Sequence, residues 1–187
     1  MRMALPVTEW DAHYAAGGDF RPVTSEEEVA FNLNVGPGDG LSALDIGCGT
    51  GGFARFLRER GYSVRGVDYA GAAISLAQSR HEGIAQLSFD CWNAEERHWK
   101  GIPSYDLISC RLSYAFIQEK GEFLNNVRGH LSPGGVFHVM TPHADRLPPT
   151  RRDIGVSAEE VKELCMDWNS VKEYDLDAHH VCYTLTL

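Results

Sequence analysis

The sequence of 187 residues has no long hydrophobic run and carries few basic residues, and each of these absences counts against a class of protein. No stretch approaches the roughly 18 apolar residues of a membrane-spanning helix, and the N-terminus lacks the charged-then-apolar layout of a signal peptide. Lys and Arg number 17 against 26 Asp and Glu, which gives a net charge of −9. Nucleic-acid binders usually carry a basic patch. A cytoplasmic protein that binds neither nucleic acid nor membrane is therefore expected.

The cysteines also exclude two kinds of site. They are an odd, scattered set without a C-x-x-C pair, so neither a disulfide framework nor a structural metal site is predicted. Four of them fall in predicted strands or helices, where we expect small buried apolar groups: Cys91, Cys110, Cys165 and Cys182. The fifth, Cys48, lies in a glycine-rich turn. We expect it to be a small residue beneath a ligand, not a nucleophile.

The stretch from Ala43 to Phe53, ALDIGCGTGGF, is the most informative part of the chain. An apolar run over residues 41–46 ends in four glycines within six residues, and a helix-like pattern begins at Phe53. This pattern predicts a strand, a tight turn and a helix start. Glycine lets a ligand lie against the backbone and permits a positive φ. The turn is therefore predicted to bind a ligand.

Two kinds of ligand are consistent with this turn, a dinucleotide and a ligand that carries an ammonium group. Gly47, Gly49 and Gly52 fit the dinucleotide pattern G-x-G-x-x-G, and Asp68 follows at the end of the next apolar run, where a ribose-binding acid belongs. Asp45, however, stands two residues before the first glycine, where its carboxylate would repel a pyrophosphate. A ligand that carries an ammonium group is favoured instead.

The segment from Asp45 to Gly51 resembles the first motif of the class I S-adenosylmethionine-dependent methyltransferases. Four further stretches resemble later motifs of that family in the same order: its ribose-binding acid, its adenine-edge motif, its fourth strand and the turn into its fifth, at Gly66–Tyr69, Asn93–Glu96, Tyr105–Arg111 and Leu131–Phe137. Asn93 stands where the family more usually has aspartate. Specific motifs cover roughly residues 38–141, and the last third resembles the family by layout.

The remaining pattern agrees with that fold. Short apolar runs alternate with helical ones, which argues for a parallel sheet with helices on both faces. Strands are expected near residues 41–46, 63–68, 86–91, 106–110, 135–141, 171–176 and 180–186, and helices near 52–60, 71–80, 117–131 and 157–167. The last two strands are too close for a crossover and imply a hairpin. The predicted fold is α/β, a Rossmann-like doubly wound seven-stranded sheet, mostly parallel with a terminal antiparallel hairpin strand.

One methyltransferase domain is expected over residues 1–187, with an N-terminal helical lid over 1–37 and a cofactor-binding core over 38–187. The first lid helix is predicted to be capped by Thr8–Asp11 and to end at Gly17, and the second to run from Thr24 to Asn34.

The resemblance implies the cofactor S-adenosyl-L-methionine, with S-adenosyl-L-homocysteine as product. Ligands in open α/β sheets lie beyond the carboxyl ends of the strands. The turn and Asp45 would contact the amino-acid part of the cofactor, Asp68 its ribose and Tyr69 its adenine ring. The full set of predicted cofactor-binding residues is Tyr14, Arg21, Asp45, Gly47, Cys48, Gly49, Gly51, Asp68, Tyr69, Asn93, Ala94, Glu95 and Arg111.

The implied reaction is in-line methyl transfer to an O, N or S atom of a small molecule. His143 is the first candidate for a general base, followed by Tyr114 and His13. The short Pro-rich loop over residues 144–156 carries three arginines, which raises the hypothesis of an anionic acceptor; the alternative is a solvated loop that balances nearby carboxylates. His179 and His180 are expected to lie in the hairpin, far from the site.

Other functions remain open at this point. One is a protein that binds S-adenosylmethionine without transferring methyl, either a regulator or a non-methylating enzyme of the same fold. Another is a nicotinamide-dependent oxidoreductase, which is favoured by the G-x-G-x-x-G overlap alone. Asp45 and the terminal hairpin count against it.

Overall fold

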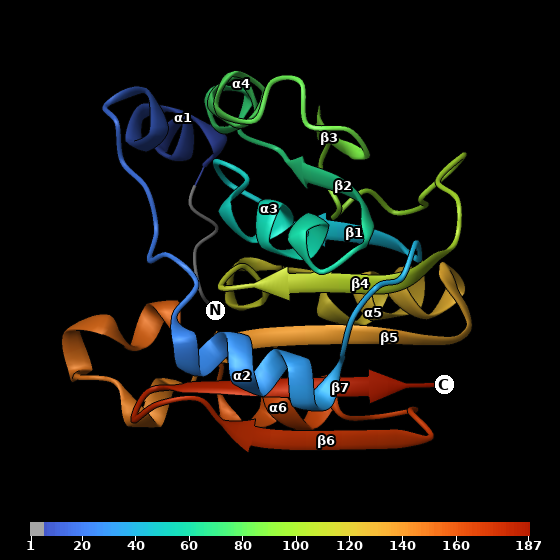
Figure 1. Cartoon of the computed structure of the whole chain (residues 1–187). Coiled ribbons are helices and arrows are strands. Elements are labelled where there is room, and N and C mark those ends of the chain that lie inside the picture. Colours follow the sequence, from blue (N-terminus) through green and yellow to red (C-terminus); the bar gives the residue numbers. More distant parts are fainter. Residues whose placement is uncertain (1–5) are drawn as a thin grey trace. The chain divides into compact units, whose positions relative to one another are not determined.

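The computed structural model describes residues 6–187, which form an α/β fold with seven strands in the order β3-β2-β1-β4-β5-β7-β6 (Figure 1). β2 pairs in parallel with β1 and β3, and β4 with β5, whereas β7 is antiparallel to both β5 and β6. The predicted fold class, including the terminal hairpin, is confirmed. The strands are β1 (Ser42–Ile46), β2 (Ser63–Asp68), β3 (Leu87–Cys91), β4 (Tyr105–Arg111), β5 (Leu131–Pro142), β6 (Ser170–Asp175) and β7 (His180–Thr186).

The chain divides into two compact units, with the boundary between Ala94 and Glu95. The first unit holds β1 to β3 with helices α1 (Val7–Ala15), α2 (Ser25–Asn34), α3 (Gly52–Glu59) and α4 (Gly71–Arg80). The second holds β4 to β7 with α5 (Lys120–Gly129), α6 (Ala158–Leu164) and the 3-10 helices η1 (Tyr114–Phe116), η2 (Ala144–Arg146) and η3 (Pro149–Ile154). The two predicted lid helices belong to the same unit as the first three strands, and the assignment of a single domain stays a prediction.

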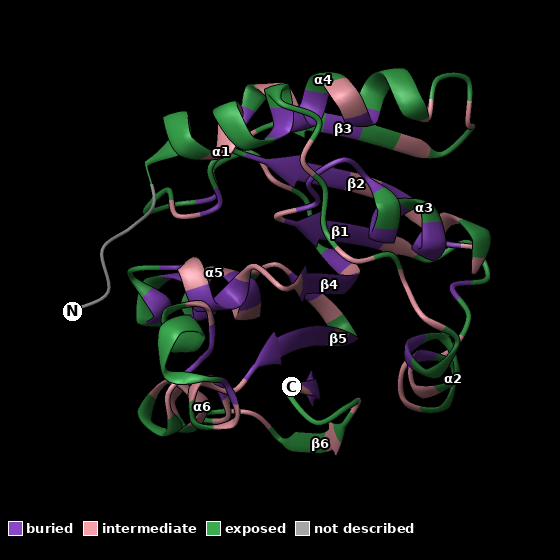
Figure 2. Ribbon diagram, turned by 90° about the vertical axis from the view of Figure 1, so that its left-hand side faces the viewer, coloured by how far each residue is buried: buried purple, intermediate pink, exposed green. Residues whose placement is uncertain are grey.

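Aromatic packing joins α2 and α3 in the first unit. Phe31 of α2 is 1% exposed, and its ring centroid lies 5.3 Å from that of Phe56. Phe53 stacks on Phe56 at 5.5 Å, as the i, i+3 spacing on one helix face allows. Each fully buried aromatic of this kind contributes about 1.5–3 kcal/mol to folding. In Figure 2, β1 and β2 are buried along most of their length.

A buried ion pair joins α5 and α6 in the second unit. Lys120 has a side-chain exposure of 6%, and its Nζ lies 2.8 Å from Oε1 of Glu160. The same ammonium donates to the carbonyl of Ile117 at 2.6 Å and lies 5.4 Å from the ring centroid of Tyr114. Glu160 also belongs to the capping box that Ser157 forms at the start of α6. One carboxylate thus serves both the cap of α6 and the docking of α5.

The start of the first lid helix differs from its prediction. The helix begins at Val7 with Pro6 as N-cap, so Thr8 lies inside it. Asp11 does not cap its own helix: its carboxylate accepts from the backbone N–H of Ala72 in the first turn of α4, at 2.9 Å. A free N–H at a helix start attracts a carboxylate from any segment within reach. The cap that sequence assigned to α1 therefore stabilises α4.

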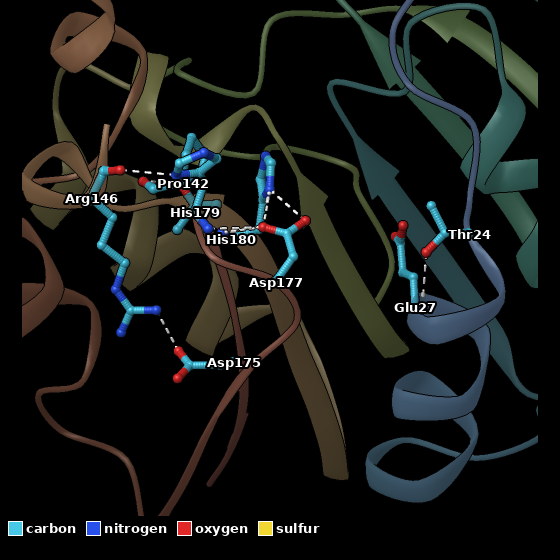
Figure 3. A network of polar contacts seen from close by, with 9 residues as sticks. Thr24, Glu27, Pro142, Arg146, Asp175, Asp177, His179 and His180 are labelled. Atoms are coloured by element: carbon cyan, nitrogen blue, oxygen red, sulfur yellow. Dashed lines mark hydrogen bonds and ion pairs between the residues drawn. The ribbon is translucent and has the colours of Figure 1, made fainter. Parts of the chain in front are cut away.

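Other predicted boundaries agree more closely. The hydroxyl of Thr24 accepts from the N–H of Glu27 at 3.3 Å, which confirms it as the N-cap of α2 (Figure 3). The Pro-rich loop over residues 144–156 contains the two short helices η2 and η3.

All five cysteines are free thiols, and Cys110 and Cys182 are buried as expected. Cys91, the last residue of β3, is exposed, so the expectation of a buried group is wrong there; its Sγ lies 3.6 Å from the carbonyl oxygen of Tyr69. Among the described residues, no helix has the length and apolarity needed to cross a membrane.

Candidate functional site

The glycine-rich turn after β1 is held by backbone hydrogen bonds to the neighbouring strand. The N–H groups of Gly47 and Cys48 both donate to the carbonyl of Val67, at 2.8 and 3.0 Å, and the N–H of Gly51 closes the turn onto the carbonyl of Cys48 at 2.9 Å. Gly47, Gly49 and Gly51 have φ values of 69°, 53° and 85°. The left-handed conformation predicted for the turn is present, and it follows from the lack of a side chain.

The room for a side chain differs among the glycines of the turn: two positions admit only glycine, and a third would accept a larger residue. A Cβ on Gly49 would lie 2.8 Å from the hydroxyl of Tyr14, and one on Gly51 would lie 2.6 Å from the Phe89 ring. A Cβ on Gly52 would meet nothing within 4 Å. The third glycine of the dinucleotide pattern serves close helix–strand packing, and Gly52 has no such contact.

A matched pair of substitutions tests this difference. Gly51→Ala is expected to lower the free energy of unfolding by about 2 kcal/mol, because it adds the cost of a left-handed non-glycine residue and a clash with Phe89. Gly52→Ala is expected to be neutral or stabilising by about 0.5 kcal/mol. Chemical denaturation of both variants measures the two changes. Equal losses would contradict the assignment.

Asp68, at the end of β2, holds the turn and the start of α4 together. Its Oδ2 accepts from the N–H of Gly49 at 3.0 Å and its Oδ1 from the N–H of Ala70 at 2.9 Å. Burial raises the pKa of this carboxyl, against the lowering effect of the backbone N–H donors. An ionised carboxylate has about four acceptor sites. The carboxylate therefore keeps acceptor capacity for a ligand hydroxyl beside the backbone bonds that it already accepts.

Two further side chains of the turn region, those of Asp45 and Cys48, are buried. Asp45 is 1% exposed and Cys48 is 8% exposed. Burial, reinforced by the charges of Asp45 and Asp68, raises the pKa of the Cys48 thiol well above its usual range. A protonated thiol is a poor nucleophile, so Cys48 has the packing role expected of it.

Asp19 ties the segment after α1 to the turn. Its carboxylate accepts from the hydroxyl of Thr50 at 2.9 Å and from the Arg80 guanidinium at 2.5 Å. Partial burial works against ionisation, but the hydrogen bonds from Arg80, Phe20 and Thr50 lower the pKa of Asp19 overall. Sequence reasoning missed this residue because its partners lie 31 and 61 positions away.

The N-terminal aromatics gather around Tyr14. Tyr14 is 4% exposed and packs against Ala70 and Ala73, and burial and the charge of Asp68 raise the pKa of its hydroxyl. His13, a candidate base, is exposed, and its ring centroid lies 5.2 Å from that of Tyr14 and 5.3 Å from that of Phe20. Tyr14 therefore lies beside the glycine turn, as a cofactor-covering residue would.

The remaining predicted residues of the first unit lie at the ends of its segments. Tyr69 directly follows β2 and is 36% exposed, and Asn93 is exposed two residues beyond β3, while Ala94 is buried. Arg21 is half-buried in the segment between α1 and α2. Their exposed positions leave Tyr69 and Asn93 accessible to a ligand.

Four predicted residues lie in the second unit: Glu95, Arg111, Tyr114 and His143. Oε2 of Glu95 accepts from the N–H of Gln118 at 2.7 Å, which fixes the start of the α5 segment. Arg111 is the last residue of β4 and is half-buried. Tyr114 is fully buried, and burial raises the pKa of its hydroxyl, so the side chain is poorly suited to act as a base.

His143 directly follows β5. Arg111, the last residue of β4, pairs with Met140, which is three residues before His143 on β5. Arg111 and His143 therefore lie at the same end of the paired strands. Nε2 of His143 lies 2.7 Å from Oη of Tyr183 on β7. Sequence reasoning missed Tyr183, because the β5–β7 register that brings it beside His143 has no local signal.

The hairpin turn lies against this segment, contrary to expectation. His179 accepts through its carbonyl from the N–H of His143 at 3.1 Å. Its Nδ1 lies 2.8 Å from the carbonyl oxygen of Arg146 (Figure 3). Arg146 donates to Asp175 at 2.5 Å, and Asp177 accepts from His180. His179 was expected to lie far from the site, whereas it contacts the predicted site residue His143, because β7 pairs with β5 up to Pro142.

The described residues contain no group of three or more His, Cys, Asp or Glu side chains that could hold a metal ion. The polar groups described above are backbone amides and two buried carboxylates in the first unit, and a His–Tyr pair in the second.

Comparison with known proteins identifies the family. A family model described as "Methyltransferase domain" matches residues 44–137, which run from within β1 through the glycine turn and strands β2 to β4 into β5. The chain belongs to the methyltransferase-domain family. The resemblance to class I S-adenosylmethionine-dependent methyltransferases is confirmed by this match.

Relatives within the family act on different substrates. The chain is 33% identical over 149 residues to the mRNA cap guanine-N(7) methyltransferase of Caenorhabditis elegans, covering 70% of this chain and 39% of that protein. It is 26% identical over 137 residues to the ubiquinone biosynthesis O-methyltransferase of Leptothrix cholodnii, covering 71% and 57%. The chain thus spans about half the length of the curated relatives that it matches.

Among solved structures, the N-methyltransferase NodS from Bradyrhizobium japonicum WM9, in complex with S-adenosyl-L-homocysteine, has a TM-score of 0.74. The two chains are 16% identical, and the match covers 96% of each. At this identity the likeness establishes a shared fold.

Proposed function

We propose that this member of the methyltransferase-domain family transfers a methyl group from S-adenosylmethionine to a small-molecule acceptor. The observation that carries the proposal is the glycine turn hydrogen-bonded to Asp68, with Asp45 buried beside it, within the stretch that the family model matches. Relatives named as methyltransferases, and a structural neighbour solved with S-adenosyl-L-homocysteine, support the choice of cofactor.

The residues present fit that cofactor. Three glycines of the turn have positive φ and carry no side chain, so a ligand can approach the backbone there. The carboxylate of Asp45 suits an ammonium group. Asp68 keeps acceptor capacity beside its backbone bonds, which suits the hydroxyls of a ribose. Tyr69 and Asn93 would hold the adenine ring and its edge, and Arg21 the cofactor carboxylate.

Methyl transfer from a sulfonium requires little covalent participation by the protein. When bound, the cofactor supplies an already activated methyl group on its sulfonium. The chain's own residues would hold the acceptor in line and exclude water. His143 is the polar group that we assign to the acceptor, since it follows the end of β5 and is partly exposed.

A second acceptor class has one observation in its favour, the similarity to an mRNA cap methyltransferase. The net charge of −9 opposes it, because phosphate contacts with Lys and Arg supply most nucleic-acid affinity. A screen of purified protein with S-adenosylmethionine against small carboxylates, thiols, amines, phenols and a capped RNA distinguishes the two. Formation of S-adenosylhomocysteine with a small molecule supports the proposal. Turnover with capped RNA alone would replace its acceptor, and cofactor binding without any turnover would indicate a regulator.

The arginines of the 144–156 loop test whether the acceptor is anionic. Arg146 is engaged by Asp175, whereas Arg151 and Arg152 are exposed, and Nε of Arg152 lies 3.5 Å from the carbonyl oxygen of Leu147. The double variant Arg151→Ala/Arg152→Ala is expected to raise the KM of an anionic acceptor about tenfold, since one lost charged hydrogen bond is worth about 1.5 kcal/mol. Arg97→Ala, which removes an arginine with 80% side-chain exposure from the same unit, is the matched control. Kinetics that change equally in both would discard an anion-binding role for the loop.

A further inference from the structure

His143 and Tyr183 form a pair of parallel rings at the end of β5. Their planes lie within 8° of each other with centroids 6.1 Å apart, and Nε2 of the histidine is 2.7 Å from Oη of the tyrosine. Tyr183 is fully buried, whereas His143 is partly exposed. Nε2 of the imidazole is thus committed to the protein, while the residue as a whole keeps partial exposure.

The backbone of His143 is fixed on three sides. Its N–H donates to the carbonyl of His179 at 3.1 Å, and its carbonyl accepts from the N–H of Arg146 at 3.1 Å. It also forms an isolated bridge with Val156. The ring therefore meets Tyr183 in a geometry set by the β5–β7 register and the hairpin turn, not by a flexible loop.

The buried hydroxyl determines where the proton of the imidazole sits. In the described part of the chain, the hydrogen-bond partner of the Tyr183 hydroxyl is Nε2 of His143. A buried hydroxyl hydrogen left without an acceptor is destabilising. Burial also raises the pKa of Tyr183, so the phenol keeps its proton and donates a hydrogen bond to Nε2. In a neutral imidazole whose Nε2 accepts, the proton is on Nδ1.

Charged groups around the ring act in both directions. Burial lowers the pKa of His143, and the nearby guanidinium of Arg146 lowers it further. Three carboxylates that face the ring from η2 and β6 oppose this effect: Asp145, Glu173 and Asp175. The net effect favours the neutral ring.

We propose that Tyr183 is a positioning residue that holds His143 as the neutral Nδ1–H tautomer, so that His143 offers the acceptor a hydrogen-bond donor and not a base. This inference rests on the proposed function. Nδ1 makes no hydrogen bond to any described residue, which leaves it available to a ligand.

The substrate class that suits this arrangement is an acceptor that attacks without first losing a proton, such as a carboxylate or a thiolate. A lone pair of the acceptor forms the bond to the methyl carbon, the carbon–sulfur bond of the sulfonium breaks, and its electron pair stays on sulfur. No proton passes to the protein. The Nδ1–H of His143 would hold the anionic acceptor in line.

Nitrogen-15 NMR of the imidazole tests the tautomer without any substrate. In the wild type, Nδ1–H is expected to exceed Nε2–H by about tenfold, because the alternative strands a buried donor. Tyr183→Phe keeps the ring but should bring the ratio towards one and raise the pKa of His143, because a hydrogen bond to the neutral form is lost. Tyr174→Phe, on the adjacent strand β6, should change neither. A wild-type spectrum dominated by Nε2–H overturns the proposal even if Tyr183→Phe fails to fold.

Kinetics of two His143 variants test the role in transfer. His143→Gln keeps a donor but no base, and is expected to retain kcat/KM for an anionic acceptor within about threefold, whereas loss of a general base would cost about 100-fold. His143→Ala should lose activity about tenfold, as one charge-assisted hydrogen bond disappears. Equal, large losses in both variants overturn the donor role. A protein that binds the cofactor and methylates nothing overturns the proposed function, while the tautomer spectrum still tests Tyr183.

Discussion

Asp68→Ala is expected to weaken S-adenosylhomocysteine binding about 100-fold, since two charge-assisted hydrogen bonds to ribose are worth about 1.5 kcal/mol each. The carboxylate has the position for this role, at the end of β2 and beside the glycine turn. It also accepts from Gly49 and Ala70, so the substitution loosens the turn as well. Calorimetric titration measures the loss.

Two further variants separate binding from folding. Asp68→Asn keeps an acceptor for the turn, so its stability should be closer to that of the wild type than the stability of Asp68→Ala. It still loses the negative charge. Asp90→Ala removes a carboxylate of the neighbouring strand that pairs with Arg65 at 2.8 Å, and it should bind normally. Unchanged affinity in a folded Asp68→Ala protein would remove Asp68 from the cofactor site.

Lys120→Met is expected to lower the free energy of unfolding by about 3 kcal/mol, because removing one member of a buried ion pair leaves the other uncompensated. The carboxylate of Glu160 loses its cation at 2.8 Å, and the carbonyl of Ile117 loses its donor at 2.6 Å. For a chain of this size the melting temperature should fall by about 10 °C.

A double-mutant cycle shows whether the pair is the cause. Lys120→Met/Glu160→Gln should recover part of the loss, because the uncompensated carboxylate is gone while an amide can still accept from Ser157. Arg55→Met breaks the exposed pair with Glu59 on α3 and should cost less than about 0.5 kcal/mol. Similar losses in Lys120→Met and Arg55→Met would refute the buried pair as a stabilising contact.

Sequence alone predicted the strand–turn–helix, the order of elements and the hairpin, because hydrophobic periodicity and glycine spacing are local signals. The contacts that it missed join distant positions. Asp19 meets Thr50 31 residues away, Asp11 meets Ala72 61 residues away, and His143 meets Tyr183 40 residues away. Asp11 also shows how a local rule misleads: it fits a cap for its own helix, but the free N–H groups of α4 lie within its reach.

The same distinction holds within the candidate site. Four glycines looked equivalent in sequence, yet a Cβ would clash at Gly51 and meet open space at Gly52. His143 was predicted as a base from its place after β5, and the tyrosine that occupies its Nε2 became visible once β7 was paired with β5.

The most direct test of the account is calorimetric titration of the wild-type protein with S-adenosylmethionine and, separately, with NADH. A buried Asp45 beside the turn predicts binding of the sulfonium cofactor with a Kd in the micromolar range, about −8 kcal/mol, and no heat with NADH. Binding of NADH without binding of S-adenosylmethionine would contradict the cofactor assignment and the methyl transfer proposed from it.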